Sequence, residues 1–146
     1  MVGLKVIDVP GATGYVDTNY LGKGQYAVAA LDEVDFVWVH VEAPDEAGHE
    51  SDLDKKIAAI QDCDQKVLGT ILNGLKKRGE RFRILLLPDH PTPIATGSHD
   101  PAPVPVILYD SESEESNAVP FDERARDEAK LRVPESHRLI ELLFRE

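Results

Sequence analysis

A chain of 146 residues with 42% hydrophobic and 29% charged residues has the composition of a soluble globular protein that can bury its own core. Its formal net charge of −11 would repel phosphates and argues against a nucleic-acid partner. No apolar run predicts a membrane span, the N-terminus lacks a signal-peptide pattern, and the single cysteine excludes an internal disulfide. We therefore expect a cytoplasmic protein without a membrane partner.

Apolar runs alternate with helical patterns in the first half of the chain. Residues 4–9 (LKVIDV) predict a short strand that a Pro-Gly turn ends, and residues 21–32 predict a helix. Residues 34–41 (VDFVWVHV) form a near-continuous apolar run, which is typical of a strand buried on both faces. Residues 51–78 carry apolar side chains at helical spacing and predict the longest helix, with Ser51 as its N-cap.

The second half of the chain is predicted to hold two strands around a proline-rich loop. Residues 81–88 (RFRILLLP) and 104–109 (VPVILY) read as strands. Six of the ten prolines fall within residues 88–105, so this loop is stiff but lacks regular hydrogen-bonded structure. Residues 110–120 are an acidic link, and residues 135–146 predict a terminal amphipathic helix.

The order of the predicted elements is typical of one α/β domain over residues 1–146, with a mainly parallel sheet flanked by helices. Such sheets bind ligands beyond the carboxyl ends of their strands. Acidic and imidazole side chains follow two of the strands, and a further histidine lies in the proline-rich loop: Asp45, His49, Asp89, His90 and His99. Carboxylate oxygen with imidazole nitrogen suits Zn²⁺, Mn²⁺, Co²⁺ or Fe²⁺. The pattern indicates a metal site, although each residue taken alone is more often a turn-former or helix cap than a ligand.

Three segments occur in order along the chain: VPGATGYVDTNYLGK, VHVEAPDEAGHE and LLLPDHPTPIATGSHDPAPVPVILYD. Together they resemble the archaeal-type branch of the cofactor-independent phosphoglycerate mutases, a group within the alkaline phosphatase superfamily, over about residues 4 to 145. The resemblance implies that the chain is the C-terminal part of an alkaline-phosphatase-like core. It also implies that the parent enzyme interconverts 2- and 3-phosphoglycerate through a phosphoserine intermediate, in glycolysis and gluconeogenesis.

The resemblance assigns roles to the five candidate ligands. Asp45, His49 and His99 would bind one divalent metal ion, and Asp89 and His90 would belong to a second. Mn²⁺ is the expected ion, with Zn²⁺, Co²⁺ and Mg²⁺ as alternatives, and no organic cofactor is expected. The implied partner is a small phosphorylated substrate, phosphoglycerate.

The chain departs from the family pattern in its length. The early strand that ends in aspartate, the nucleophilic serine and the inserted substrate domain of the family have no match here, and no serine of the chain stands in the nucleophile's context. We therefore expect no catalytic nucleophile in this chain, no activity from it alone, and self-association through an uncovered sheet edge. Two other hypotheses stay open: a related metal-dependent phosphotransferase or phosphatase acting on another small phosphate ester, and a non-catalytic α/β module that binds a partner.

Overall fold

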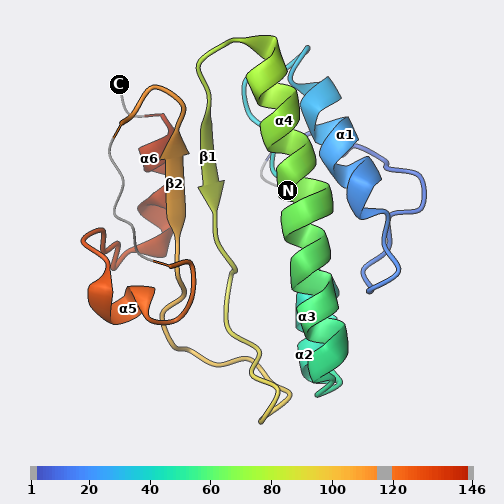
Figure 1. Ribbon diagram of the computed structural model, residues 1–146, viewed down its shortest axis with the longest axis vertical. Helices are drawn as coiled ribbons and strands as arrows, with labels where there is room; N and C mark the ends of the chain where they lie inside the picture. Colours follow the sequence, from blue (N-terminus) through green and yellow to red (C-terminus); the bar gives the residue numbers. More distant parts are fainter. Residues whose placement is uncertain (1–2, 115–119, 145–146) are drawn as a thin grey trace. The chain divides into compact units, whose positions relative to one another are not determined.

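The computed structural model describes residues 3–114 and 120–144 (Figure 1). The chain divides into two compact units, each with its own architecture. The first comprises Met1–Gly79 and Thr92–Ser98, and the second comprises Glu80–Pro91 and His99–Glu146. Among the described residues, every helix is too short or too polar to span a bilayer.

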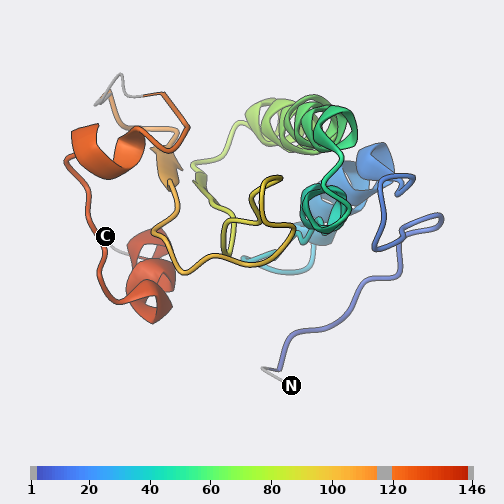
Figure 2. The same ribbon diagram turned by 90° about the horizontal axis from the view of Figure 1, so that it is seen from below.

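The first unit is built from helices. Its elements are α1 (Tyr20–Ala30), α2 (Ala43–His49), α3 (Leu53–Asp62), the π-helical segment η1 (Cys63–Leu68) and α4 (Gly69–Arg78). The last three follow one another without a break and form one long helix, and α1 lies alongside it (Figure 1, Figure 2). The helices predicted over residues 21–32 and 51–78 are confirmed, with small differences at their ends.

Local sequence determines where these helices begin and end. The Asn19 side chain accepts a hydrogen bond of 2.8 Å from a backbone N–H in the first turn of α1 and caps that helix. The N-cap of α3 is Asp52, whose carboxylate accepts a backbone N–H at 3.0 Å, and the prediction of Ser51 was wrong by one residue. Ser51 instead has a φ of 56° and turns the chain between α2 and α3. Gly79, with a φ of 70°, ends α4.

Close packing of α1 on the long helix depends on a glycine. A Cβ atom at Gly24 would lie 2.9 Å from the Thr70 Cβ and 3.0 Å from the Val67 carbonyl oxygen, so a larger residue would push the helices apart. The core of this unit comprises Tyr20, Ala43, Ala59 and Val67, with Val16, Val39, Val41, Cys63 and Ile71 packed against it. Burial of these apolar side chains is the main stabilising contribution to the unit.

Residues 34–41 do not form the doubly buried strand that their apolar run predicts. The segment pairs with no other strand in the described part of the chain. Val39 and Val41 pack against the core, whereas Trp38 is 69% exposed and His40 is exposed. The alternation has a simple physical reason, because an extended chain points successive side chains to opposite faces and only one face here meets the core. Residues 4–8 are likewise exposed and Val9 is half-buried, and this segment also pairs with no strand among the described residues.

The second unit contains a short sheet and short helices. Strand β1 (Arg83–Leu86) pairs with β2 (Ile107–Asp110) in antiparallel register, and the helical pieces are α5 (Ala125–Glu128), η2 (Ser136–Arg138) and α6 (Leu139–Leu143). An Arg83 guanidinium N–H donates to the Leu143 carbonyl oxygen at 3.2 Å and ties α6 to β1. The terminal helix predicted over residues 135–146 is shorter than expected, because only Leu139–Leu143 are α-helical among the residues described there. Part of the predicted acidic link, residues 115–119, lies outside the described residues.

The mainly parallel sheet that the element order predicts is not found among the described residues, whose sheet has two antiparallel strands. A parallel pair needs a crossover that carries the chain back to the starting end of the sheet, usually through a helix. Residues 87–106 hold neither helix nor strand and return the chain in the opposite direction. The pairing of β1 with β2 is therefore antiparallel.

Candidate metal centre

Helix α2 brings an aspartate and a histidine onto one face. Its sequence is APDEAGH, with Pro44 in the first turn, where the missing N–H costs nothing. Asp45 and His49 are four residues apart and so lie one above the other on the helix surface. The His49 Nε2 atom is 3.2 Å from the Asp45 Oδ2 atom, and both side chains are partly exposed.

The other ring nitrogen of His49 determines what Nε2 can do. His49 Nδ1 lies 2.9 Å from the Gly97 carbonyl oxygen. A carbonyl oxygen only accepts hydrogen bonds, so Nδ1 carries the hydrogen and Nε2 is the nitrogen that can bind a ligand. The hydrogen bond to Gly97 is the main cause that raises the pKa of His49 above its ordinary value, and the Asp45 carboxylate adds to it.

The segment Thr92–Ser98 packs within the first unit and contacts the same face of α2. The Thr92 side chain is 4% exposed, and its hydroxyl donates a hydrogen bond to the Asp45 Oδ1 atom. The Lys56 ammonium group donates to the Thr92 carbonyl oxygen at 2.5 Å. A Cβ atom at Gly48 would lie 2.7 Å from that carbonyl and 2.8 Å from the Lys56 nitrogen, so glycine is needed for the segment to approach the helix.

The first unit also ties residues near its N-terminus to the end of α2. The Tyr15 hydroxyl donates to a Glu50 carboxylate oxygen at 2.6 Å, and the Lys55 ammonium donates to the other Glu50 oxygen at 2.7 Å. The hydrogen bond from Lys55 is the main cause that lowers the pKa of Glu50 below its ordinary value, and the hydrogen bond from Tyr15 adds to it. These contacts hold the last turn of α2, and hence His49, against its neighbours.

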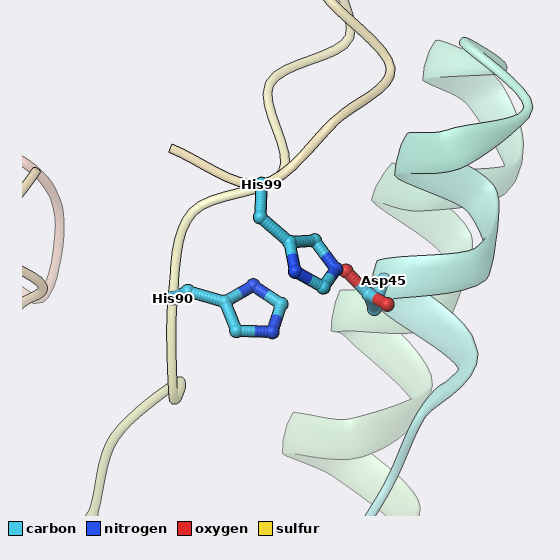
Figure 3. A group of neighbouring side chains, drawn as sticks. All are labelled: Asp45, His90 and His99. Atoms are coloured by element: carbon cyan, nitrogen blue, oxygen red, sulfur yellow. The ribbon is translucent and has the colours of Figure 1, made fainter. Parts of the chain in front are cut away.

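In the second unit, two histidines lie at the base of the proline-rich loop. The imidazole rings of His90 and His99 are stacked, with centroids 3.6 Å apart and an interplanar angle of 30° (Figure 3). The Asp100 backbone N–H donates to the Pro91 carbonyl oxygen at 3.0 Å and closes the loop beside them. The His90 Nε2 atom is 3.4 Å from the Asp89 Oδ2 atom, and the Asp89 side chain is 72% exposed. The stacking brings ring nitrogens of the two imidazoles close together.

The structure thus places the five predicted ligands in two groups. The first unit brings Asp45 and His49 together, and the second unit brings Asp89, His90 and His99 together. The predicted ligand set of Asp45, His49 and His99 draws on both units and stays a prediction.

Three contributors to the arrangement on α2 were missed from sequence: Thr92, the carbonyl group of Gly97, and Lys56. A threonine between two prolines is typical of a stiff turn, and a lysine on a helix is normally solvated. A backbone carbonyl carries no sequence signal at all. Only the return of residues 92–98 to α2 reveals their roles.

Comparisons with known proteins agree on a family. A family model described as "Metalloenzyme superfamily" matches residues 1–145. The 2,3-bisphosphoglycerate-independent phosphoglycerate mutase 2 of Methanothermobacter thermautotrophicus is 50% identical over 142 residues, which are 97% of this chain and 35% of that protein. A probable 2,3-bisphosphoglycerate-independent phosphoglycerate mutase of Geobacter sulfurreducens is 49% identical over 97% of this chain and 36% of its own length.

A solved structure is also similar. The structure of the PH0037 protein from Pyrococcus horikoshii matches with a TM-score of 0.86 and 29% sequence identity, over 98% of this chain and 42% of that chain. The present chain spans about a third of the length of the curated relatives it matches: 35% of the Methanothermobacter protein and 36% of the Geobacter protein.

Proposed function

This chain belongs to the metalloenzyme superfamily, and from that premise we propose that it is the C-terminal metal-binding part of a 2,3-bisphosphoglycerate-independent phosphoglycerate mutase. The complete enzyme would interconvert 2- and 3-phosphoglycerate in glycolysis and gluconeogenesis, in the cytoplasm. Support comes from relatives of that name at 50% and 49% identity over nearly the whole chain. The family resemblance predicted from three segments of the sequence is confirmed by the same relatives.

The Asp45–His49 pair is the observation that carries the metal-binding part of the proposal. Because Nδ1 donates to Gly97, a neutral His49 directs the Nε2 lone pair at the Asp45 Oδ2 atom, 3.2 Å away. Two lone pairs at that distance repel each other unless a positive charge lies between them. A proton on Nε2 meets this need in the metal-free chain, and a divalent cation bound to both atoms would replace it. The donor set of carboxylate oxygen and imidazole nitrogen suits Mn²⁺, Zn²⁺ and Co²⁺.

The other predicted ligands would extend this pair. His90 and His99 each offer a ring nitrogen as a ligand atom (Figure 3). We propose that Asp45, His49 and His99 bind one ion, and that Asp89 and His90 contribute to a second. Chain connectivity supports the assignment, because His90 precedes Pro91 and Thr92, and His99 follows Ser98 directly. The segment between the two histidines is the one that hydrogen-bonds both Asp45 and His49.

The chain's residues would act by binding and orienting. When bound, divalent ions would offset the charge of a transferring phosphoryl group, which the net charge of −11 would otherwise repel. Asp45 and His49 would hold one ion at the end of α2, and the hydrogen bond from Nδ1 to Gly97 would keep the His49 ring in the binding tautomer. We assign the serine nucleophile to no residue of this chain. Both units would belong to one alkaline-phosphatase-like α/β domain, whose mainly parallel sheet would be completed by the rest of the enzyme, with residues 110–120 as an acidic link inside it.

Calorimetric titration of the chelator-stripped chain with Mn²⁺ and with Zn²⁺ tests the metal site. We expect Mn²⁺ or Zn²⁺ to bind to the parent chain. His49→Ala should weaken this binding by more than about 10–100-fold, because that is the usual cost of losing a residue that only supports a metal ligand. His40→Ala is the matched control, since it removes an exposed imidazole from the same unit and should leave affinity unchanged. Equal affinity of the His49→Ala variant and the parent chain would show that the assignment is wrong.

A further inference from the structure

Thr92 has an unusual environment for a residue of a proline-rich loop. It is 4% exposed, and with Thr18 it is one of two buried polar residues in the described part of the chain. A hydroxyl group taken out of water needs a hydrogen-bond partner, because an unpaired buried hydroxyl destabilises the fold. The partner is the Asp45 Oδ1 atom, to which the Thr92 hydroxyl donates.

The backbone of Thr92 is held as firmly as its side chain. The Lys56 ammonium donates to the Thr92 carbonyl oxygen at 2.5 Å, a charge-assisted hydrogen bond. Gly48 has no Cβ and allows this carbonyl to come close to α2. Thr92 is therefore fixed by contacts from both α2 and α3, and the position of its hydroxyl is well determined.

The consequence concerns the two carboxylate oxygens of Asp45. Oδ1 accepts the hydrogen bond from Thr92, while Oδ2 lies 3.2 Å from His49 Nε2. A carboxylate whose two oxygens are engaged differently is held against rotation about its terminal bond. Oδ2 is then the oxygen that can share a cation with Nε2, and Asp45 would bind through that single oxygen.

We propose that Thr92 is a positioning residue for the metal site, which orients Asp45 so that Oδ2 faces His49, with Lys56 holding Thr92 in place. The inference rests on the metal-binding function proposed above and deepens it. Loss of the hydroxyl removes this hydrogen bond from Oδ1, lets the carboxylate rotate more easily and weakens the binding geometry that Asp45 and His49 share.

Two substitutions at one position separate the hydroxyl from its packing. We expect Thr92→Val, which keeps the shape and loses the hydroxyl, to weaken Mn²⁺ affinity of the full chain by about 10–100-fold. Thr92→Ser keeps the hydroxyl and should stay within a few-fold of the parent. Thr18→Val is the matched control, because Thr18 is 5% exposed in the same unit but hydrogen-bonds the Thr13 backbone N–H. Its Mn²⁺ affinity should equal that of the parent.

Three outcomes of the titration would overturn the inference: parent-like affinity in Thr92→Val, equal weakening in Thr92→Val and Thr92→Ser, and equal weakening in Thr18→Val. If Thr92→Val does not fold, Lys56→Met provides the second test. It removes the ammonium group from the Thr92 carbonyl and should weaken Mn²⁺ binding several-fold, and unchanged affinity would contradict the role of Lys56.

A metal-free measurement distinguishes this inference from the proposed function. The ring nitrogen signals of His49 in nitrogen-15 NMR report how Asp45 faces Nε2. We expect them to shift in Thr92→Val and to return in Thr92→Ser. If the parent chain binds no metal but the His49 signals shift in Thr92→Val, the proposed function fails while the positioning role of Thr92 stands. Unshifted His49 signals in Thr92→Val would overturn that role.

Discussion

Cys63, the chain's one thiol, shows how burial alters the chemistry of a single residue. It begins the π-helical segment and packs against the core around Tyr20. Burial, with the nearby Asp62 carboxylate adding to it, raises the pKa of Cys63 to about 11. The thiol is therefore protonated at neutral pH, and only the thiolate is a strong nucleophile.

We predict that a disulfide reagent at pH 8 modifies Cys63 in the folded chain roughly 100-fold more slowly than in the urea-unfolded chain, because the thiolate fraction falls by about that factor. Absorbance of the released thiol reports the rate directly. The unfolded chain is the internal control, since it carries the same cysteine without burial. Equal rates in the two states would show that the thiol is not protected.

At the scale of elements, an ion-pair cluster closes one end of the β1–β2 ladder. Asp110 is the register partner of Arg83, and its carboxylate accepts from Arg83 at 2.6 Å and from Arg81 at 3.0 Å. Hydrogen bonds from Arg81, from the Glu112 backbone N–H and from Arg83 hold the pKa of Asp110 well below its ordinary value of 3.8. A carboxyl group whose pKa is lowered by folding stabilises the folded state above its ordinary pKa, and this contribution is lost as the pH falls below about 4.

We predict that Asp110→Asn lowers the hydrogen-exchange protection of the β1 and β2 amides at neutral pH. The difference from the parent should shrink as the pH falls from 4 toward 2, because Asp110 of the unfolded parent then takes up a proton that the folded chain does not bind, and the stabilisation is lost. Asp54→Asn, at an exposed acid on α3, makes the same change of charge and should leave protection unchanged. A difference between Asp110→Asn and the parent that is constant from pH 7 to pH 2 would contradict the prediction.

At the scale of the whole molecule, the two most exposed large apolar side chains among the described residues lie on extended segments. Val6 is 82% exposed and Trp38 is 69% exposed, and the segments that carry them pair with no strand among the described residues. Unpaired extended chain with apolar side chains is a template for association.

We predict that the chain self-associates, and that Trp38→Glu weakens this association by about tenfold or more, since buried tryptophans dominate interfaces. Sedimentation velocity over a concentration series measures both. Leu53→Glu, on the exposed surface of α3, is the control for added charge. A parent chain that stays monomeric at high concentration would contradict the prediction.

Much of the helical structure could be predicted from the sequence because its hydrogen bonds are local. The apolar periodicity of residues 51–78 and the glycine at position 79 suffice to predict the long helix and its end. The spacing of Asp45 and His49 likewise places both on one face of a helix, although α2 itself was not predicted. The family resemblance rests on the same short motifs.

Strand pairing and the environment of Asp45 depend on residues far apart in sequence. Whether residues 34–41 are covered on one face or two depends on which distant segments reach them, and their apolar run carries no such information. Thr92 contacts Asp45 across 47 residues, and Gly97 contacts His49 across 48. The sequence by itself therefore determined α1, the long helix and the residue types of the candidate metal ligands, because these follow from neighbours a few positions apart. Only the tertiary structure decided the antiparallel sheet, the half-buried segment and the hydroxyl that orients Asp45, because each requires two distant segments to meet.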